Sequence, residues 1–258
     1  AEPGPWRRSV IRAREGGEAV GELLRRGWLE IVADPGARHE AGAQPLATPE
    51  QAAAVDAIVG AGMRFRPWLL HGVTGSGKTE VYLRLAAHAL AQGRQVLMLV
   101  PEIALTPQLE QRVAQRFAAA NVVSLHSALA DGARSRGFVQ ALSGRADIVL
   151  GTRLAVFAPL PRLGLILVDD EHDASYKQQE GVRYSARDVA VWRGRQRDVP
   201  VVLGSATPSL ESWFHARSER YALQRLSRRA VAATLPAVRC IDTHRTKLDE
   251  RLSPALPD

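Results

Sequence analysis

The sequence predicts an α/β protein in which a parallel β-sheet carries helices on both faces. Short apolar runs recur along the chain and alternate with amphipathic segments of helical length. Such runs are typical of strands buried on both faces, and strand–helix alternation is typical of parallel sheets with crossover helices. A glycine-rich segment at residues 72–79 also separates the first such strand from the first helix, as in nucleotide-binding α/β domains.

The expected elements follow each other in a regular order. The first helix should begin at residue 79, because Val81, Leu85 and Ala89 would then share one face. Pro101 separates the next apolar run from the second helix. The expected strands are residues 66–72, 94–101, 121–126, 147–152, 163–170 and 200–205, and the expected helices are residues 79–92, 104–119, 131–143 and 186–197.

Residues 1–45 differ in composition from the rest of the chain. They combine a short helical pattern with a Pro/Gly/Ala-rich stretch, residues 33–45, that is typical of a linker. We therefore expect a domain boundary near Pro45, one nucleotide-binding domain over residues 46–220 and a C-terminal extension over residues 221–258.

The composition excludes several classes of protein. With 46% hydrophobic residues and a formal charge of +7, the chain is too apolar for intrinsic disorder. It has no run of about 18 uncharged apolar residues that could span a membrane, and its start lacks the apolar core of a secretory signal. We therefore expect a cytoplasmic protein without a membrane partner. Cys240, the single cysteine, excludes a disulfide framework and a four-cysteine zinc site, so we expect no zinc in this chain.

The strongest chemical signal is the segment GVTGSGKT, which fits the phosphate-binding loop pattern between a strand and a helix. Glycines let backbone N–H groups curl around an anion, and the helix N-terminus adds a favourable partial positive charge. Lys78 would reach the β- and γ-phosphates of a nucleotide, and the Thr79 hydroxyl would bind Mg²⁺. The expected nucleotide-binding residues here are Gly72, Val73, Thr74, Gly75, Ser76, Gly77, Lys78 and Thr79.

A second, acidic motif follows the last but one expected strand. Asp169, Asp170, Glu171 and His172 come directly after the apolar run LGLILV. An acidic group at the carboxyl end of a parallel strand lies beside the phosphate-binding loop, where it can hold Mg²⁺ through water. The loop alone leaves a kinase, a GTPase, a transport motor and a helicase open, and the acidic motif favours a helicase.

Together, these motifs resemble superfamily 2 helicases. Residues 99–108 (LVPEIALTPQ), GTR at 151–153, the DDEH tetrad and GSATPS at 204–209 appear in that superfamily's order. The fuller string from about Thr48 to Ser212 is similar to the PriA (primosomal protein N′) family of replication-restart helicases. The resemblance implies a RecA-like P-loop NTPase fold, a DNA-dependent ATPase with 3′–5′ helicase activity, and ATP with Mg²⁺. It also implies single-stranded and forked DNA as partners, together with other primosome and single-strand-binding proteins.

The ends of the chain resemble further parts of that family. Residues 1–45 are similar to the end of its winged-helix domain, so the resemblance implies a partial winged-helix segment before the ATP-binding domain. Residues 235–256 are similar to the segment that precedes its cysteine-rich zinc region. No second sheet domain follows Ser209, so we expect a motor half that does not unwind DNA alone.

The resemblance also implies a role for individual residues. Gln51 would read adenine, Asp169 would hold Mg²⁺, and Asp170 would orient the attacking water, with Lys78 completing the catalytic set. The turn from Ser205 to Thr207 would couple the nucleotide state to DNA, and His172 would link the acidic tetrad to that turn. The remaining implied DNA contacts are Thr106, Thr152 and Arg153 on loops at one sheet edge, and Tyr176, Lys177, Arg183 and Tyr184 on an aromatic-rich loop.

One departure from the family bears on the chemistry. The family tetrad is Asp-Glu-Glu-His, whereas Asp170 stands at its second position here. The aspartate keeps the charge but is one methylene shorter, and a misplacement of about 1 Å can cost on the order of 10²-fold in rate. We therefore expect normal ATP binding and slowed hydrolysis. We do not expect Glu171 to substitute, because neighbouring residues in a strand point to opposite faces.

Two alternatives to a DNA-dependent motor stay open at this point. A nucleotide- and DNA-binding module that does not hydrolyse ATP would also fit the aspartate and the missing second domain. A small-molecule kinase would explain the phosphate-binding loop but neither the DDEH nor the GSAT motif. His126 and His172 lack a second ligand at zinc spacing, so a metal role is not expected for them.

Overall fold

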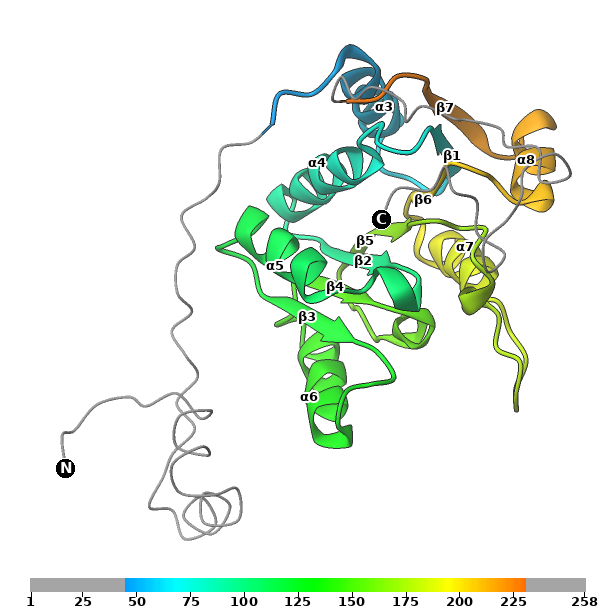
Figure 1. Cartoon of the computed structure of the whole chain (residues 1–258). Helices are drawn as coiled ribbons and strands as arrows, with labels where there is room; N and C mark the ends of the chain where they lie inside the picture. The colour runs from blue at the N-terminus through cyan, green and yellow to red at the C-terminus, as the bar shows by residue number, and fades with distance from the viewer. Residues whose placement is uncertain (1–44, 231–258) are drawn as a thin grey trace, which may run out of the picture.

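The computed structural model describes residues 45–230, which form a single parallel β-sheet with helices on both faces (Figure 1). The seven strands lie in the order β3-β4-β2-β5-β6-β1-β7. The expected α/β fold is confirmed. The expected winged-helix remnant and Cys240 lie outside the described residues.

Six strands correspond to the six apolar runs of the sequence. Each is shorter than its run by one to three residues, because the terminal positions of the runs serve as loops. β5 is fully buried along its length, as expected for a strand covered on both faces. The six are β1 (Pro67–Gly72), β2 (Gln95–Leu99), β3 (Val122–Leu125), β4 (Ile148–Gly151), β5 (Leu163–Val168) and β6 (Val201–Ser205).

The helices agree with the amphipathic segments, and two more are present. The expected helices are α4 (Lys78–Ala91), α5 (Pro107–Arg116), α6 (Asp131–Leu142) and α7 (Ala186–Arg197). The additional ones are α3 (Pro49–Gly60) and α8 (Leu210–Arg217). Short 3₁₀ turns occupy Glu102–Ala104, Arg153–Phe157 and Ala174–Tyr176.

The sheet continues past residue 220, where we expected the domain to end. β7 (Ala222–Leu226) pairs in parallel with β1 and forms an edge of the sheet. Its sequence is ALQRL, in which only Leu226 is buried. An edge strand with one buried side chain has almost no apolar pattern, which is why the sequence did not predict it.

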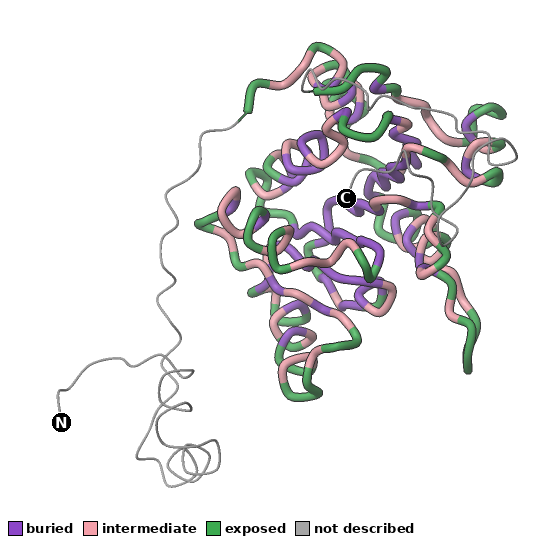
Figure 2. The backbone as a smooth tube through the Cα atoms, in the orientation of Figure 1, coloured by how far each residue is buried: buried purple, intermediate pink, exposed green. Residues whose placement is uncertain are grey.

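The two faces of the sheet bury separate hydrophobic cores. Figure 2 marks the buried residues in purple. α3, α4 and α5 contribute Ile58, Leu85 and Val113 to one core. α6, α7 and α8 contribute Ala141, Ala190 and Ala216 to the other. The helices therefore pack on both faces of the sheet. The carboxyl ends of the parallel strands lie at one edge, which is where ligands bind in such folds.

None of the helices within residues 45–230 combines the length and apolar character needed to cross a membrane.

Candidate nucleotide-binding site

The phosphate-binding loop between β1 and α4 has two positions at which the backbone conformation favours glycine. Gly75 and Gly77 have φ values of 79° and 81°, in the left-handed region that side chains disfavour. A Cβ at Gly77 would also overlap the side-chain amide of Gln51. Gly77 is thus favoured both by its backbone conformation and by the neighbouring Gln51 side chain, and Gly75 by its backbone conformation alone.

Lys78 opens α4 at the mouth of this loop. Its Nζ donates a hydrogen bond to the carbonyl oxygen of Gly72, at 3.1 Å. The lysine and the following Thr79 are both half-buried, so each stays accessible from solvent. The ammonium group and the hydroxyl are therefore held at the start of a helix, where an anion is favoured.

Gln51 joins α3 to the phosphate-binding loop. The residue is 2% exposed, its Nε2 donates to the carbonyl of Ser76 at 2.8 Å, and its Oε1 accepts from the N–H of Thr48 at 2.9 Å. The Thr48 hydroxyl accepts from the N–H of Gln51 in return, which completes a capping box. The Gln51 side chain is therefore almost fully buried and held against the phosphate-binding loop.

Glu50 holds the chain that leaves β7 beside the same loop. Its carboxylate accepts from the N–H groups of Ser227, at 2.8 Å, and Arg228, at 3.2 Å, and from the Ser227 hydroxyl. The hydrogen bond from Ser227 lowers the pKa of Glu50. Ala230 then donates its N–H to the carbonyl of Gly75, at 2.9 Å. The sequence carried no signal for Glu50, because its partners are 177 and 178 residues away.

Asp169 lies directly after β5 and is oriented by a tyrosine that no sequence motif indicates. The Tyr82 hydroxyl donates to Asp169 Oδ1 at 2.9 Å. Tyr82 is fully buried one helical turn after Lys78, and it fits only because β6 has a glycine, Gly204, where a Cβ would overlap the hydroxyl. Burial raises the pKa of Asp169, as does the neighbouring charge of Asp170, while Tyr82 and Lys78 act in the opposite direction.

The acidic tetrad forms a turn rather than the end of a strand. β5 ends at Val168, and Asp170 has a φ of 42°, in the left-handed region. Strand alternation therefore does not apply to Asp170 and Glu171, and the expectation that it would keep Glu171 from substituting for Asp170 is wrong. Glu171 is nevertheless committed elsewhere, since it is 2% exposed and its carboxylate lies 3.2 Å from the Arg187 guanidinium.

His172 connects the tetrad to the turn after β6, as expected. Its Nδ1 is hydrogen-bonded to Ser205 Oγ at 2.8 Å, and its Nε2 to Thr207 Oγ1 at 3.2 Å. The N–H of Thr207 also donates to Ser205 Oγ, at 3.0 Å. The imidazole thus spans both hydroxyls of the turn.

Two of the residues expected to contact DNA have buried side chains in this structure. Thr152 is 2% exposed beneath the 3₁₀ turn Arg153–Phe157. Tyr176 is also 2% exposed and donates its hydroxyl to the carbonyl of Asp169 at 2.6 Å. Tyr176 belongs to a hydrophobic core of the sheet, and Thr152 precedes the 3₁₀ turn as its N-cap.

Other expected DNA contacts are accessible to different degrees. Thr106 is half-buried and caps α5, its hydroxyl accepting from the N–H of Leu109. Arg153 donates to the carbonyls of Ser175 and Lys177, at 3.1 Å each. Its guanidinium therefore supports the base of the aromatic-rich loop.

The aromatic-rich loop is an antiparallel arm. Lys177 pairs with Ser185 across its base, and the strand-like segments extend away from the sheet beside α7 (Figure 1). Lys177 and Arg183 are exposed. Tyr184 is half-buried and packs edge-to-face on Phe157, with ring centroids 4.9 Å apart. Of the residues expected to contact DNA on this arm, the two cations are exposed and the aromatic rings are not; Glu180 and Val182 are exposed beside them.

The donor set at the sheet edge suits Mg²⁺. Thr79 and Asp169 supply oxygen atoms, and within residues 45–230 there is no group of three His, Cys, Asp or Glu residues that could hold a metal on its own. Mg²⁺ typically keeps several waters and binds through one or two protein oxygens and substrate phosphates. These residues fit that pattern and not a zinc site.

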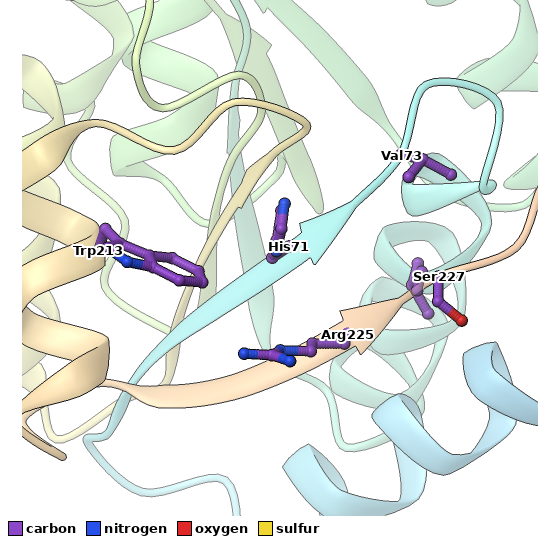
Figure 3. Close-up of a pocket in the computed structure, with 6 residues that line it drawn as sticks. His71, Val73, Trp213, Arg225 and Ser227 are labelled. Atoms are coloured by element: carbon purple, nitrogen blue, oxygen red, sulfur yellow. The ribbon is translucent and has the colours of Figure 1, made fainter.

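A separate cavity of about 310 Å³ lies beside the loop on the α8 side of the sheet (Figure 3). His71 and Trp213 meet there edge-to-face with ring centroids 5.5 Å apart, and Arg225 lies over the Trp213 ring. The cavity shares only Val73 with the phosphate-binding loop, so it is not the phosphate cradle. Its lining residues are His71, Val73, Trp213, Arg225, Leu226 and Ser227.

A phosphate-binding loop, an acidic tetrad and a Ser-Ala-Thr turn on one edge of a parallel sheet define a helicase-type nucleoside triphosphatase domain. The DEAD/DEAH box helicase family matches residues 48–213, and the chain belongs to that family.

Within it, the chain is similar to replication restart protein PriA of several bacteria, which confirms the resemblance inferred from the motifs. It is 51% identical to PriA of Chlamydia pneumoniae over 188 residues, 72% of this chain and 25% of that protein. It is 41% identical to PriA of Bacillus subtilis over 224 residues, 85% of this chain and 28% of that protein. The chain thus spans about a quarter of the length of these relatives.

Solved structures of helicases share the fold. The DEAD-box helicase Mss116 bound to single-stranded RNA and UDP-BeF superposes with a TM-score of 0.54 at 17% identity, over 81% of this chain and 45% of that one. RecG bound to a three-way DNA junction gives 0.51 at 21% identity, over 81% of this chain and 25% of that one.

Proposed function

We propose that this chain is the ATP-binding half of a DNA-dependent ATPase and 3′–5′ DNA helicase that acts in replication restart. The observation that carries the proposal is that one acidic tetrad is hydrogen-bonded both to the helix that follows the phosphate-binding loop and to the Ser-Ala-Thr turn. Lys78 and Tyr82 share one face of α4, Tyr82 bonds to Asp169, and His172 bonds to Ser205 and Thr207. A change at the nucleotide can therefore reach the turn through the tetrad, whose residues 169–172 are consecutive in the chain.

The loop residues bind the triphosphate in this proposal. Backbone N–H groups between Gly72 and Gly77 and the ammonium of Lys78 hold the phosphate oxygens, and Gln51 reads adenine. Thr79 and Asp169 hold Mg²⁺, which when bound neutralises charge on the β- and γ-phosphate oxygens. The backbone N–H dipoles of the loop are already oriented toward the phosphate site before the nucleotide binds, so they attract the phosphates without reorganisation.

Asp170 orients the attacking water, and its geometry supports slow hydrolysis. The left-handed backbone at this residue sets the direction of a side chain that is one methylene shorter than a glutamate. Its N–H donates to Asp169 Oδ1 at 3.1 Å, so the backbone of the two acids is locked together. A short carboxylate on a fixed backbone cannot move toward the γ-phosphate at low cost.

DNA contacts in this proposal come from exposed groups near the carboxyl edge of the sheet. Thr207 is exposed on the coupling turn, and Lys177 and Arg183 are exposed on the arm. Hydroxyls and cations contact phosphates without reading bases, which suits a translocating motor. Single-stranded and forked DNA and other primosome or single-strand-binding proteins are the proposed partners.

Steady-state ATPase activity with and without single-stranded DNA tests the proposal. The chain is compared with a version extended through a second helicase domain, and Lys78→Ala is the negative control for each. We expect turnover that DNA stimulates in the extended protein and that Lys78→Ala abolishes. ATP and DNA binding without turnover in both proteins would instead support the second candidate, a non-hydrolysing nucleotide- and DNA-binding module, which the short Asp170 side chain favours.

A further inference from the structure

Glu171, the third residue of the tetrad, is a buried carboxylate whose oxygen atoms are fully occupied. Its Oε1 accepts from the N–H of Ser209 at 2.7 Å. Its Oε2 accepts from the hydroxyls of Ser209 at 2.9 Å and Ser212 at 2.8 Å. Its own N–H donates to the carbonyl of Gly204 at 3.0 Å. One side chain thus holds the start of α8 against the end of β5.

Arg187 of α7 supplies the positive charge that this carboxylate requires. Its NH1 group lies 3.2 Å from Glu171 Oε2 and donates to Ser209 Oγ at 2.8 Å. Burial would lower the pKa of Arg187, but the hydrogen bond and charge of Asp188, together with those of Glu171, outweigh it and raise that pKa. Arg187 thus contacts the Glu171 carboxylate directly and shares Ser209 with it, the kind of hydrogen-bonded arrangement in which a buried ion pair is tolerated.

Glu171 and its neighbour His172 hold the two ends of one turn. His172 binds Ser205 and Thr207 at the start of the segment, and Glu171 binds Ser209 and Ser212 at its end. Ser209 also caps α8 through its hydroxyl, which accepts from the N–H of Ser212. The position of the turn relative to Asp169 and Asp170 is thus set by adjacent residues of the same tetrad.

We propose that Glu171 and Arg187 are positioning residues that hold the Ser205–Ser209 turn in register with Asp169 and Asp170, and that this register sets ATP turnover but not ATP affinity. The claim about turnover rests on the proposed function, whereas the claim about the turn does not. Arg187 belongs to no helicase motif recognised in the sequence, yet it is the only described guanidinium that bonds to both Glu171 and Ser209 within residues 45–230.

Amide hydrogen exchange on the full chain, without nucleotide, tests whether Glu171 and Arg187 hold the Ser205–Ser209 turn. The variants are Glu171→Gln, which keeps the size but loses an acceptor and the charge, and Arg187→Met. The matched control is Asp188→Asn, which removes the exposed partner of Arg187 and leaves Glu171 in place. We expect the amides of Ser209 and Ser212 to exchange about 10-fold faster in both variants and at the native rate in the control. Native exchange at these amides in Glu171→Gln would overturn the proposal.

A double variant guards against simple loss of the fold. Glu171→Gln leaves the Arg187 charge without its buried partner, and Glu171→Gln with Arg187→Met removes both charges. We expect the double variant to melt at a higher temperature than Glu171→Gln alone. If the fall in melting temperature of the double variant equals the sum of the falls in the two single variants, the residues act independently. That result would overturn the pairing.

The claim about turnover is tested by comparing kcat with ATP affinity in the protein extended through a second helicase domain. We expect Arg187→Met to lower the DNA-stimulated kcat on the order of 10-fold or more while the Kd for a fluorescent ATP analogue stays within about twofold. Arg187→Lys should recover part of kcat, because it keeps the charge. Equal losses in kcat and affinity would contradict a positioning role. If the parent protein has no turnover, the proposed function fails, and hydrogen exchange alone decides whether Glu171 and Arg187 hold the turn.

Discussion

Replacing Tyr82 with phenylalanine removes one hydroxyl and tests how Asp169 is held. The ring stays in its buried site, and only the hydrogen bond to Asp169 Oδ1, 2.9 Å long, is lost. A hydrogen bond to a charged group contributes about 1.5–3 kcal/mol. For a domain of this size about 2–4 °C is lost per kcal/mol, so we expect the melting temperature at pH 8 to fall by about 3–12 °C.

The loss of stability caused by Tyr82→Phe should be larger at high pH than at low pH. The pKa of Asp169 is raised by burial above its ordinary value of 3.8, and Tyr82 works against that rise. A raised folded-state pKa means that the buried carboxyl costs stability as pH climbs through it, and Tyr82→Phe increases this cost. Below 3.8 the carboxyl is protonated in the folded and unfolded states, so the extra cost disappears there.

Thermal unfolding of the chain at pH 8 and pH 4 measures the effect. Tyr184→Phe is the matched control, because Tyr184 is half-buried against Phe157 and is not a hydrogen-bond partner of Asp169. We expect a larger destabilisation for Tyr82→Phe at pH 8 than at pH 4 and none of this pH dependence for the control. An equal loss at both pH values would refute the view that the hydroxyl stabilises a charged Asp169.

Three further outcomes are expected. Asp170→Glu should raise DNA-stimulated turnover severalfold in the extended protein, because the longer side chain reaches further toward the γ-phosphate, and unchanged steady-state rates would contradict this. Gly77→Ala should abolish binding of a fluorescent ATP analogue, because the new Cβ overlaps Gln51; near-native affinity would show that the loop adapts. Lys177→Ala with Arg183→Ala should weaken single-stranded DNA binding and lessen its salt dependence in an anisotropy titration by about two phosphate contacts, and an unchanged salt slope would exclude the arm.

Much of the fold could be predicted because buried parallel strands have a strong local pattern. The six apolar runs and four amphipathic segments correspond to elements of the structure, and α7 spans the expected residues 186–197. β7 could not be predicted, since it lies at a sheet edge with polar residues at most positions. α3 depends on a capping box and on packing against α4 rather than on a strong apolar face.

The site divides in the same way. Lys78, Asp169 and the link from His172 to Ser205 follow from short motifs, because their chemistry requires particular residue types at fixed spacing. Tyr176 and Thr152 were expected to contact DNA, but both side chains are buried. A motif records which residue stands at a position and not which way its side chain turns.

The sequence by itself determined the class of the fold, the phosphate-binding loop and the acidic tetrad, since each is encoded within a few consecutive residues. Only the tertiary structure decided how the tetrad is held. Tyr82 meets Asp169 across 87 residues, and Glu171 meets Ser209 across 38. Hydrogen bonds require alignment to within a few tenths of an ångström. Such alignment between distant segments arises only when the whole sheet and both layers of helices have packed.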